Sequence, residues 1–290
     1  LLRHELTQCL PELCAILEGP IASVKHRDET IVGMELNPTL PQRGPVHLRL
    51  NVSPLKDAQE TTQGVAIVMD DVTERKRLEA QRRLFERMVS PAVIKQLDPD
   101  QIQMGGERVT ITTLFADIRG FTSYSESLTP EDLVSVLNRY LAAAADAVLA
   151  QEGTVDKFMG DAVMAWFNAP IPQEDHTLRA VRASLGIRDA IKSLHRELPK
   201  EAHLDFGVGI HFGEAVLGLV GTEKRLDYTA IGDSVNTAKR VQENSASNQI
   251  LISDIAYQFV KKDIEVRPCE SVHAKGKSEP IKVYEVIGLL

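Results

Sequence analysis

The fold is decided by a stretch that begins Thr112-Thr113-Leu114-Phe115-Ala116-Asp117-Ile118 and ends Ala162-Val163-Met164-Ala165-Trp166-Phe167. The first segment is an apolar run that predicts a buried strand with Asp117 at its end. Residues 154–167 predict two short strands joined by a turn that displays Asp161. Two carboxylates beside backbone corners suit a hard cation, because Mg²⁺ prefers oxygen ligands and takes only one or two protein carboxylates. Taken singly, each acid also fits an ordinary turn residue.

Periodic patterns continue this architecture through the second part of the chain. The predicted order is strand 109–117, helix 131–152, hairpin 154–167, helix 175–198, strands 203–211 and 215–220, a short run 228–231, helix 234–243, strand 249–252, helix 254–260 and two last strands. Thr129 is the expected N-cap of the first helix, with Pro130 in its first turn. Strand–helix–hairpin–helix–strand predicts an α+β fold, a ferredoxin-like split βαβ core with a C-terminal extension.

Residues 1–71 predict a separate, small antiparallel domain. Strands are expected at 46–52 and 64–69, between turn-rich segments, and the second strand leads into a charged helix. The exit Asp71-Val72-Thr73-Glu74-Arg75 resembles the end of a PAS sensor domain, over about residues 14–76. The front half of a PAS pattern is missing or highly divergent, so no ligand can be named. An unrelated small antiparallel domain is the alternative.

Residues 72–104 predict a helical connector, with one helix over about 72–97. Leu78, Phe85 and Ala92 recur every seven residues, which suits a short parallel coiled coil between two copies of the chain. A single amphipathic linker helix explains the same pattern equally well. The remaining residues, 105–290, form the expected second domain.

Composition narrows the function classes. The chain has 290 residues, a net charge of −8 and a pI of about 5.6, which argues against a nucleic-acid surface. Three cysteines without a metal or redox spacing favour a reducing, cytoplasmic location. No apolar run approaches the ~18 residues of a membrane span. The chain begins without a methionine, so we expect a segment of a larger sensor protein.

Four blocks in the second domain resemble the signature blocks of class III nucleotide cyclases, in the family's order and spacing. They are Phe115-Ala116-Asp117-Ile118-Arg119-Gly120-Phe121-Thr122, Lys157-Phe158-Met159-Gly160-Asp161, Gly209-Ile210-His211-Phe212-Gly213-Glu214 and Ile231-Gly232-Asp233-Ser234-Val235-Asn236-Thr237-Ala238-Lys239-Arg240. The resemblance covers about residues 106–288. It implies conversion of a nucleoside triphosphate to a 3′,5′-cyclic monophosphate and pyrophosphate.

The resemblance implies two Mg²⁺ ions per site, with Mn²⁺ as an expected substitute. Asp117 and Asp161 match the family's metal-binding aspartates, and the carbonyl of Ile118 is a further ligand. The backbone N–H groups of Gly120, Phe121 and Thr122 are expected to hold the phosphates. A residue without Cβ favours such a corner.

Asn236 and Arg240 match the family's transition-state pair. They are four residues apart on a predicted helix and share one face. Arg240 is expected to neutralise charge on the α-phosphoryl oxygens, and Asn236 to orient the ribose. An ion pair of Arg240 with Glu243 or Glu214 is the alternative. Lys275 matches a phosphate-contacting lysine, with Lys277, Lys224 and Arg225 as competitors.

Lys157 and Thr229 match the positions that contact the purine. Lys157 can donate to N1 of adenine, and the Thr229 hydroxyl can accept from the C6 amine. Guanine reverses both groups, and a lysine facing its N1–H leaves buried polar groups unpaired. Because a hydroxyl also donates, Thr229 discriminates less than the aspartate found in many adenylyl cyclases. A threonine at this position is typical of a bacterial and soluble-type subgroup of the family. ATP is the predicted substrate.

The resemblance also implies a head-to-tail homodimer. In the family one protomer supplies the metal aspartates, and the other supplies the purine-contacting and transition-state residues. This chain carries both sets, so two equivalent sites are expected. The predicted function is an adenylate cyclase regulated by an N-terminal sensor. The alternatives are a guanylate cyclase and a catalytically inactive, cyclase-like dimerisation module.

Overall fold

The computed structural model describes residues 11–40, 43–88, 91–94, 105–126, 128–222, 225–273 and 279–290. Two structural units, Leu1–Met88 and Val89–Leu290, each contain a hydrophobic core of their own. Within the described ranges, no helix has the length and apolar character needed to cross a membrane.

The first unit is a small antiparallel sheet with one helix packed on it. Its elements are α2 (Pro11–Arg27), β1 (Ile31–Leu36), β2 (Thr39–Leu40), β3 (Gly44–Pro45), β4 (Leu48–Lys56), β5 (Thr62–Asp71) and α3 (Thr73–Met88). The three long strands have the order β1-β4-β5, and Leu13 and Leu17 of α2 pack against Leu48 and Leu50. The antiparallel prediction is confirmed, whereas α2 and β1 were not predicted from the sequence.

Strand β4 begins later and runs further than predicted, through Pro54. Pro54 lies opposite Val65 of β5, whereas β1 pairs with β4 only between Leu48 and Val52. A proline cannot donate to a ladder and is tolerated where a strand has a neighbour on one side only. The proline therefore lies within the strand, although it resembles a turn residue in the sequence.

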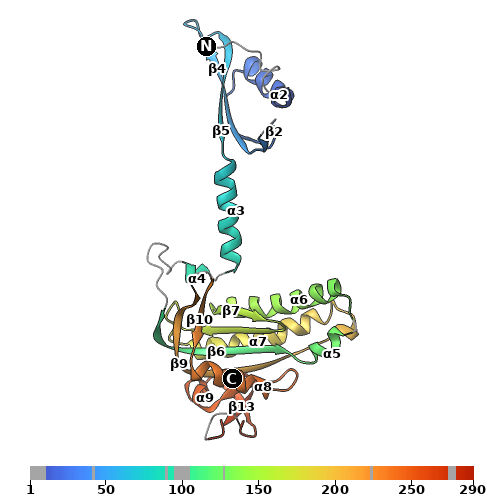
Figure 1. Ribbon diagram of the computed structural model, residues 1–290, viewed down its shortest axis with the longest axis vertical. Coiled ribbons are helices and arrows are strands. Elements are labelled where there is room, and N and C mark those ends of the chain that lie inside the picture. Colours follow the sequence, from blue (N-terminus) through green and yellow to red (C-terminus); the bar gives the residue numbers. More distant parts are fainter. Residues whose placement is uncertain are drawn as a thin grey trace. The chain divides into compact units, whose positions relative to one another are not determined.

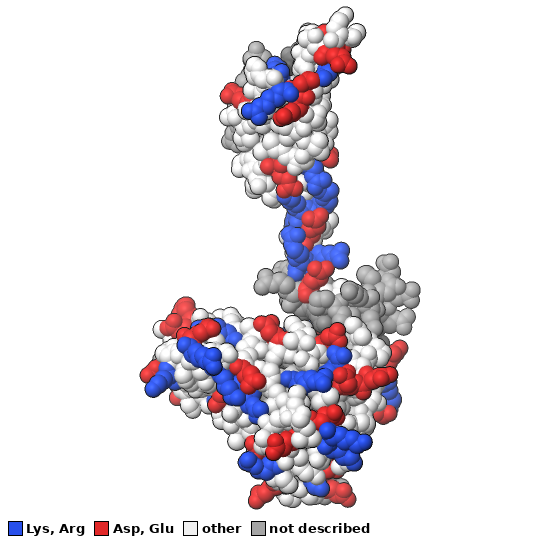
Figure 2. All heavy atoms as spheres, turned by 180° about the vertical axis from the view of Figure 1, so that it is seen from behind, with Lys and Arg blue, Asp and Glu red and all other residues white. Residues whose placement is uncertain are grey.

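The predicted connector helix over residues 72–97 is described in two parts, α3, which ends at Met88, and α4 (Pro91–Ile94), which begins with a proline that suits a first helical turn. Residues 89–90 and 95–97 lie outside the described residues. Leu78 is 58% exposed, and the side chains of Phe85 and Ala92 lie outside the described part, so the coiled coil stays a prediction. Basic side chains predominate along α3, with acidic ones between them (Figure 2).

The second unit is built on a sheet with the order β12-β13-β11-β9-β6-β8-β7, and β10 pairs with β9 outside this path (Figure 1). Its elements are β6 (Gly105–Ile118), α5 (Phe121–Ser125), α6 (Pro130–Leu149), β7 (Thr154–Met159), β8 (Ala162–Phe167), α7 (His176–Leu194), a 3₁₀ turn (Lys200–Ala202), β9 (Phe206–Thr222), β10 (Arg225–Ile231), α8 (Asp233–Glu243), β11 (Ile250–Ser253), α9 (Asp254–Val260), β12 (Ile264–Pro268) and β13 (Val283–Leu289). The four strands β9-β6-β8-β7 form the predicted ferredoxin-like core, and β11, β13 and β12 extend it.

Strand β9 corrects one prediction. Two strands, 203–211 and 215–220, were expected, but β9 is continuous from Phe206 to Thr222 and pairs with β6 from Phe206 to Leu219. Gly213 lies between the two predicted strands. A Cβ at this position would lie 2.7 Å from the Cβ of Ser234 in α8, so the glycine permits close packing of a helix.

The two faces of this sheet have different coverings. Leu114, Ala116 and Ile118 of β6 face helices α6 and α7, which lie side by side (Figure 1). Ile111 and Phe115 face the opposite side, where they pack with residues of α8 and β10. This alternation follows from the two-residue period of a strand. Because Asp117 continues the Ile111–Phe115 series, it lies on the α8 face.

Helix α6 begins as the sequence predicted. The Thr129 side chain accepts a hydrogen bond from the backbone N–H of Asp132 at 3.2 Å, and Pro130 occupies the first turn. Tyr140, Leu141, Ala144 and Val148 are buried on one stripe, at the i, i+3 and i+4 spacing of an amphipathic helix. The predicted N-cap is therefore confirmed.

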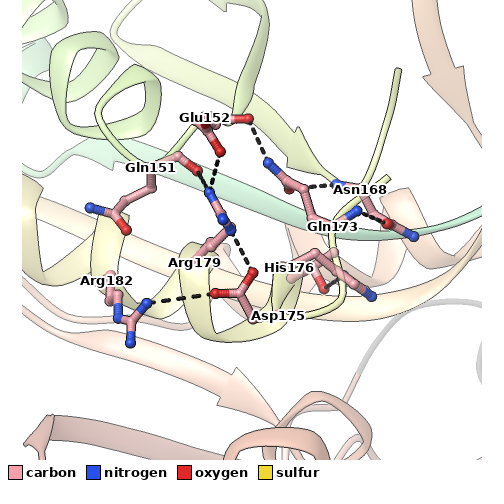
Figure 3. Close-up of polar contacts among 9 residues, drawn as sticks. Gln151, Glu152, Asn168, Gln173, Asp175, His176, Arg179 and Arg182 are labelled. Carbon is pink, nitrogen blue, oxygen red and sulfur yellow. Dashed lines mark hydrogen bonds and ion pairs between the residues drawn. The ribbon is translucent and has the colours of Figure 1, made fainter. Parts of the chain in front are cut away.

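On the helix face, Arg179 joins the start of α7 to the end of α6 (Figure 3). Its Nε donates to Asp175 at 2.5 Å, and its Nη1 donates to Glu152 at 2.5 Å. In the adjacent loop, the backbone N–H groups and side chains of Asn168 and Gln173 bond reciprocally at 3.0 and 2.7 Å. These contacts hold the loop that follows β8, so the hairpin is anchored at the end opposite to Asp161.

Candidate active site

Asp117 and Asp161 lie together at one end of the core strands. Asp117 is the penultimate residue of β6 and its side chain is 22% exposed. Asp161 follows Gly160, which has φ of 66° in the β7–β8 turn, and its carbonyl accepts from the N–H of Ile118 at 3.2 Å. Burial raises the pKa of Asp117, and the charge of Asp161 raises it further. Two acids are therefore held at one place where their ionised forms repel each other.

Two cations that were given no role from the sequence also approach Asp117. Arg119 Nη1 lies 3.4 Å from Asp117 Oδ1, and Lys239 Nζ of α8 lies 4.0 Å from Oδ2. The Arg119 guanidinium also donates to the carbonyl of Gln242 and, at 3.1 Å, to the hydroxyl of Ser245. Both cations lower the pKa of Asp117, but less than burial and Asp161 raise it. Arg119 thereby joins the end of β6 to the end of α8.

The corner after β6 has the backbone that the sequence predicted. Gly120 has φ of 77° and ψ of 4°, the left-handed conformation that favours glycine. It is the N-cap of α5, and its carbonyl accepts from the N–H of Tyr124 at 3.1 Å. The N–H groups of Phe121 and Thr122 belong to the first helical turn, where they have no partner within the helix. They are available to an oxygen ligand beside Asp117.

Asn236 and Arg240 project from the exposed face of α8. The opposite face of this helix packs directly on β9, because a Cβ at Gly209 would lie 2.2 Å from the backbone nitrogen of Gln242. Arg240 is 45% exposed and pairs with Glu243 at 2.7 Å. The predicted alternative partner is therefore present. An exposed ion pair of this kind contributes at most about 1 kcal/mol and leaves the guanidinium accessible.

Lys157 and Thr229 come together around a third residue, Asp156. Thr229 Oγ1 donates to Asp156 Oδ2 at 2.6 Å, and Lys157 Nζ lies 3.7 Å from Oδ1. Lys157 belongs to β7 and Thr229 to β10, strands that are not neighbours in the sheet. The predicted purine-contacting pair is thus close in space, and sequence reasoning overlooked the acid between them.

Some of the residues predicted to contact the phosphates lie outside the part of the chain that the structure describes. Lys275, Lys277 and Lys224 lie outside the described residues. Arg225 begins β10 and is exposed. Among the residues that the structure describes, no group of three or more His, Cys, Asp or Glu side chains is arranged to hold a metal ion. A site completed by water and phosphate oxygens needs only one or two protein carboxylates.

The predicted site residues belong to a segment that matches a known family. Residues 105–288 match the adenylate and guanylate cyclase catalytic domain. The chain belongs to this cyclase family. Residues 3–77 match the PAS fold, which extends the resemblance inferred from the sequence toward the N-terminus.

Curated relatives of this chain include adenylate cyclases. Adenylate cyclase 1 of Rhizobium meliloti is 34% identical over 187 residues, which cover 63% of this chain and 28% of the relative. The adenylate cyclase of Anabaena cylindrica is 34% identical over 217 residues, which cover 70% of this chain and 42% of the relative. The chain therefore spans less than half the length of these relatives.

Solved cyclase structures resemble the second unit. The adenylyl cyclase CyaB from P. aeruginosa has a TM-score of 0.60 and 36% identity, and it covers 62% of this chain and 95% of its own. The guanylyl cyclase Cya2 has a TM-score of 0.61 and 37% identity, covering 64% and 96%. Because an adenylyl and a guanylyl cyclase are equally similar, overall likeness does not distinguish ATP from GTP. Only individual side chains at the purine site can distinguish the two substrates.

Proposed function

We propose that this cyclase converts ATP to 3′,5′-cyclic AMP and pyrophosphate at a site shared by two copies of the chain. The observation that carries the proposal is the grouping of two carboxylates, Asp117 and Asp161, beside the N–H groups in the first turn of α5, after the Gly120 corner. Carboxylate oxygens beside amide donors suit a cation bound to a polyphosphate. The curated adenylate cyclase relatives support the same activity.

The donor set fits a pair of Mg²⁺ or Mn²⁺ ions. Asp117 is disfavoured as an anion by burial and by Asp161, so a cation beside them would relieve both effects. Asp117, Asp161 and the Ile118 carbonyl are the proposed ligands. When bound, such ions lower the pKa of the attacking 3′-hydroxyl and neutralise the phosphates.

The other side chains orient and stabilise the substrate. The N–H groups of Phe121 and Thr122 hold phosphate oxygens, and Lys275 is the proposed lysine at the phosphates. Arg240 exchanges its exposed partner Glu243 for the α-phosphoryl oxygens, whose charge grows during the reaction. Asn236, one turn earlier on the same face of α8, orients the ribose.

The purine is proposed to lie against Lys157 and Thr229. Lysine donates to N1 of adenine, whereas guanine presents an N–H there. Because this donor–donor contact leaves buried groups unpaired, ATP is the proposed substrate and GTP the weaker one.

We further propose a head-to-tail homodimer in which each site takes Asp117 and Asp161 from one copy and the purine and transition-state residues from the other. In this arrangement residues 1–71 act as the sensor, 72–104 as the connector and 105–290 as the catalytic domain. A signal at the sensor would shift the closure of the two catalytic domains. Removal of the residues before Gly105 should therefore alter dimerisation or rate, and unchanged values for both would contradict this regulation.

The activity is tested by incubating the purified chain with ATP or GTP, with Mg²⁺ or Mn²⁺, over a range of protein concentrations. Cyclic AMP formation with a specific activity that rises with concentration is expected. Cyclic GMP as the main product would identify a guanylate cyclase. A folded dimer that forms no product under any condition would identify an inactive dimerisation module.

A further inference from the structure

Asp156 occupies an irregular position in the pairing of β7 with β8. Val155 lies opposite Ala165 and Lys157 lies opposite Met164, so Asp156 is an extra residue between two regular pairs. Such a β-bulge changes the direction of the side chains around it. In a regular strand Asp156 and Lys157 would point to opposite faces. Here the Lys157 ammonium lies 3.7 Å from the Asp156 carboxylate, so the bulge brings both to one side.

The Asp156 carboxylate is enclosed and uses both of its oxygens. Its side chain is 1% exposed, with Oδ1 toward Lys157 and Oδ2 accepting from the Thr229 hydroxyl at 2.6 Å. Burial raises the pKa of Asp156, and the bonds from Thr229 and Lys157 oppose this rise. A buried acid without such partners would be strongly unfavourable. The three side chains therefore form one unit.

We propose that Asp156 is a positioning residue that makes the purine site selective for adenine by fixing the direction of the Thr229 hydroxyl. The inference rests on the proposed function, in which Lys157 and Thr229 contact the purine. A hydroxyl has one hydrogen and two lone pairs, and a carboxylate can only accept. The Thr229 hydrogen is therefore committed to Asp156, and only lone pairs are left for a ligand.

The direction of the Thr229 hydroxyl decides whether it donates a hydrogen bond to the purine or accepts one from it. A free threonine hydroxyl could accept from the C6 amine of adenine or donate to the C6 oxygen of guanine. With its hydrogen on Asp156, Thr229 accepts from adenine and opposes guanine with a second oxygen. Lys157, held beside the same carboxylate, faces adenine N1 as a donor. Both contacts then match adenine, and both leave guanine unpaired.

The decisive variant is Asp156→Asn, which keeps the size of the side chain. The Lys157 ammonium should attract the amide oxygen, so the amide NH₂ would point toward Thr229. The amide would then donate to the Thr229 oxygen and release the hydroxyl hydrogen toward the purine. The ratio of kcat/KM for ATP to kcat/KM for GTP should fall about tenfold, which is the effect of reversing one hydrogen bond. Competition of ATP and GTP against a ribose-labelled fluorescent nucleotide should show the same shift in binding.

Asp227→Asn is the matched control. Asp227 is an exposed acid on β10, two residues from Thr229, and its charge raises the pKa of Asp156 without bonding the hydroxyl. This variant should change the ATP-to-GTP ratio less than about twofold, because an exposed charge is largely screened. An equal fall in the ratio for both variants would overturn the proposal, since charge alone would then explain it.

Thr229→Val provides an independent test should Asp156→Asn fail to fold. It removes the acceptor for adenine, so ATP binding should weaken about five- to tenfold. GTP binding should change less than about twofold, because the hydroxyl gives guanine no hydrogen bond to lose. Adding Asp156→Asn to Thr229→Val should then leave the ratio unchanged. Equal weakening of ATP and GTP by Thr229→Val would overturn the proposal.

The wild-type chain separates this inference from the proposed function. A wild-type protein that binds neither nucleotide would refute the function and, with it, the inference. A wild-type protein that prefers ATP, with a folded Asp156→Asn variant whose ratio is unchanged, would overturn the inference alone.

Discussion

Two charged clusters in the cyclase unit are built in opposite ways. Around Arg179, on the α6–α7 face, the Arg179 guanidinium lies between two acids, Asp175 and Glu152, and Arg182 also approaches Asp175 at 3.6 Å (Figure 3). Around Asp117, on the α8 face, two acids lie together, and the nearest cations are 3.4 and 4.0 Å away. The bond from Arg179 lowers the pKa of Asp175, whereas burial and Asp161 raise the pKa of Asp117.

The difference shows which cluster stabilises the fold and which one is suited to a ligand. In the Arg179 cluster, opposite charges satisfy each other, so nothing further is needed. In the Asp117 cluster, like charges are held together by the ends of β6 and the β7–β8 turn at a cost to the folded protein. Perturbed acids of this kind concentrate at functional sites. Substitutions in the two clusters should therefore separate activity from stability.

The largest expected effect is the loss of activity in Asp117→Asn. Removing a proposed metal ligand should lower kcat by about a hundredfold or more. The melting temperature in metal-free buffer at neutral pH should stay the same or rise. The direction of this change follows from the raised pKa of Asp117. An acid whose pKa is higher in the folded than in the unfolded protein lowers the stability of the fold once it is ionised at neutral pH. Asparagine carries no charge, so this loss of stability is removed. A clear fall in melting temperature would show that the Asp117 charge stabilises the fold instead.

Arg240→Ala should lower kcat by about 10²–10³, the typical effect of removing a transition-state donor. Its melting temperature should change little, because the pair with Glu243 is exposed. Arg139→Ala is the control, since Arg139 is also an exposed helical arginine paired with a glutamate, Glu197. Equal activity of the two variants would show that Arg240 takes no part in the reaction.

Gly209→Ala should reduce both stability and activity. The added Cβ would lie 2.2 Å from the backbone of Gln242, so α8 must move away from β9. Overpacking of this kind costs about 1–3 kcal/mol of unfolding free energy and would displace Asn236 and Arg240. Thermal unfolding and kcat measure the two effects. Gly288→Ala is the control, because a Cβ there meets nothing within 4 Å.

Arg179→Gln should have the smallest effect, and only on stability. Loss of a partly exposed arginine between two acids should cost about 1 kcal/mol, a fall of about 2–4 °C in melting temperature, with kcat nearly unchanged. The lowered pKa of Asp175 means that this stabilisation is present above its unfolded pKa and is lost as the pH falls through its folded pKa. Wild type and variant should therefore converge in stability at acidic pH. A large loss of kcat would contradict the division between the two clusters.

Much of this architecture could be predicted from local patterns. The buried strand at residues 109–117, the N-cap at Thr129 and the split βαβ order were predicted and are present in the structure. Helix α2 was missed because Pro20 and Gly19 interrupt its pattern, and β9 was divided because Gly213 resembles a break. In both cases packing partners distant in the sequence stabilise a conformation that local propensity disfavours.

In the candidate site, too, some features follow from the local sequence and others only from tertiary contacts. The sequence by itself determined which acids, glycines and basic residues are available, because their chemistry and spacing are local properties. Only the tertiary structure decided that Arg119 joins Asp117 to α8, and that Asp156 bonds Thr229. Alternation along a regular strand would direct Asp156 away from Lys157, and a bulge against β8 reverses this. The direction of a side chain depends on strand register, which is set by contacts between residues far apart in the chain.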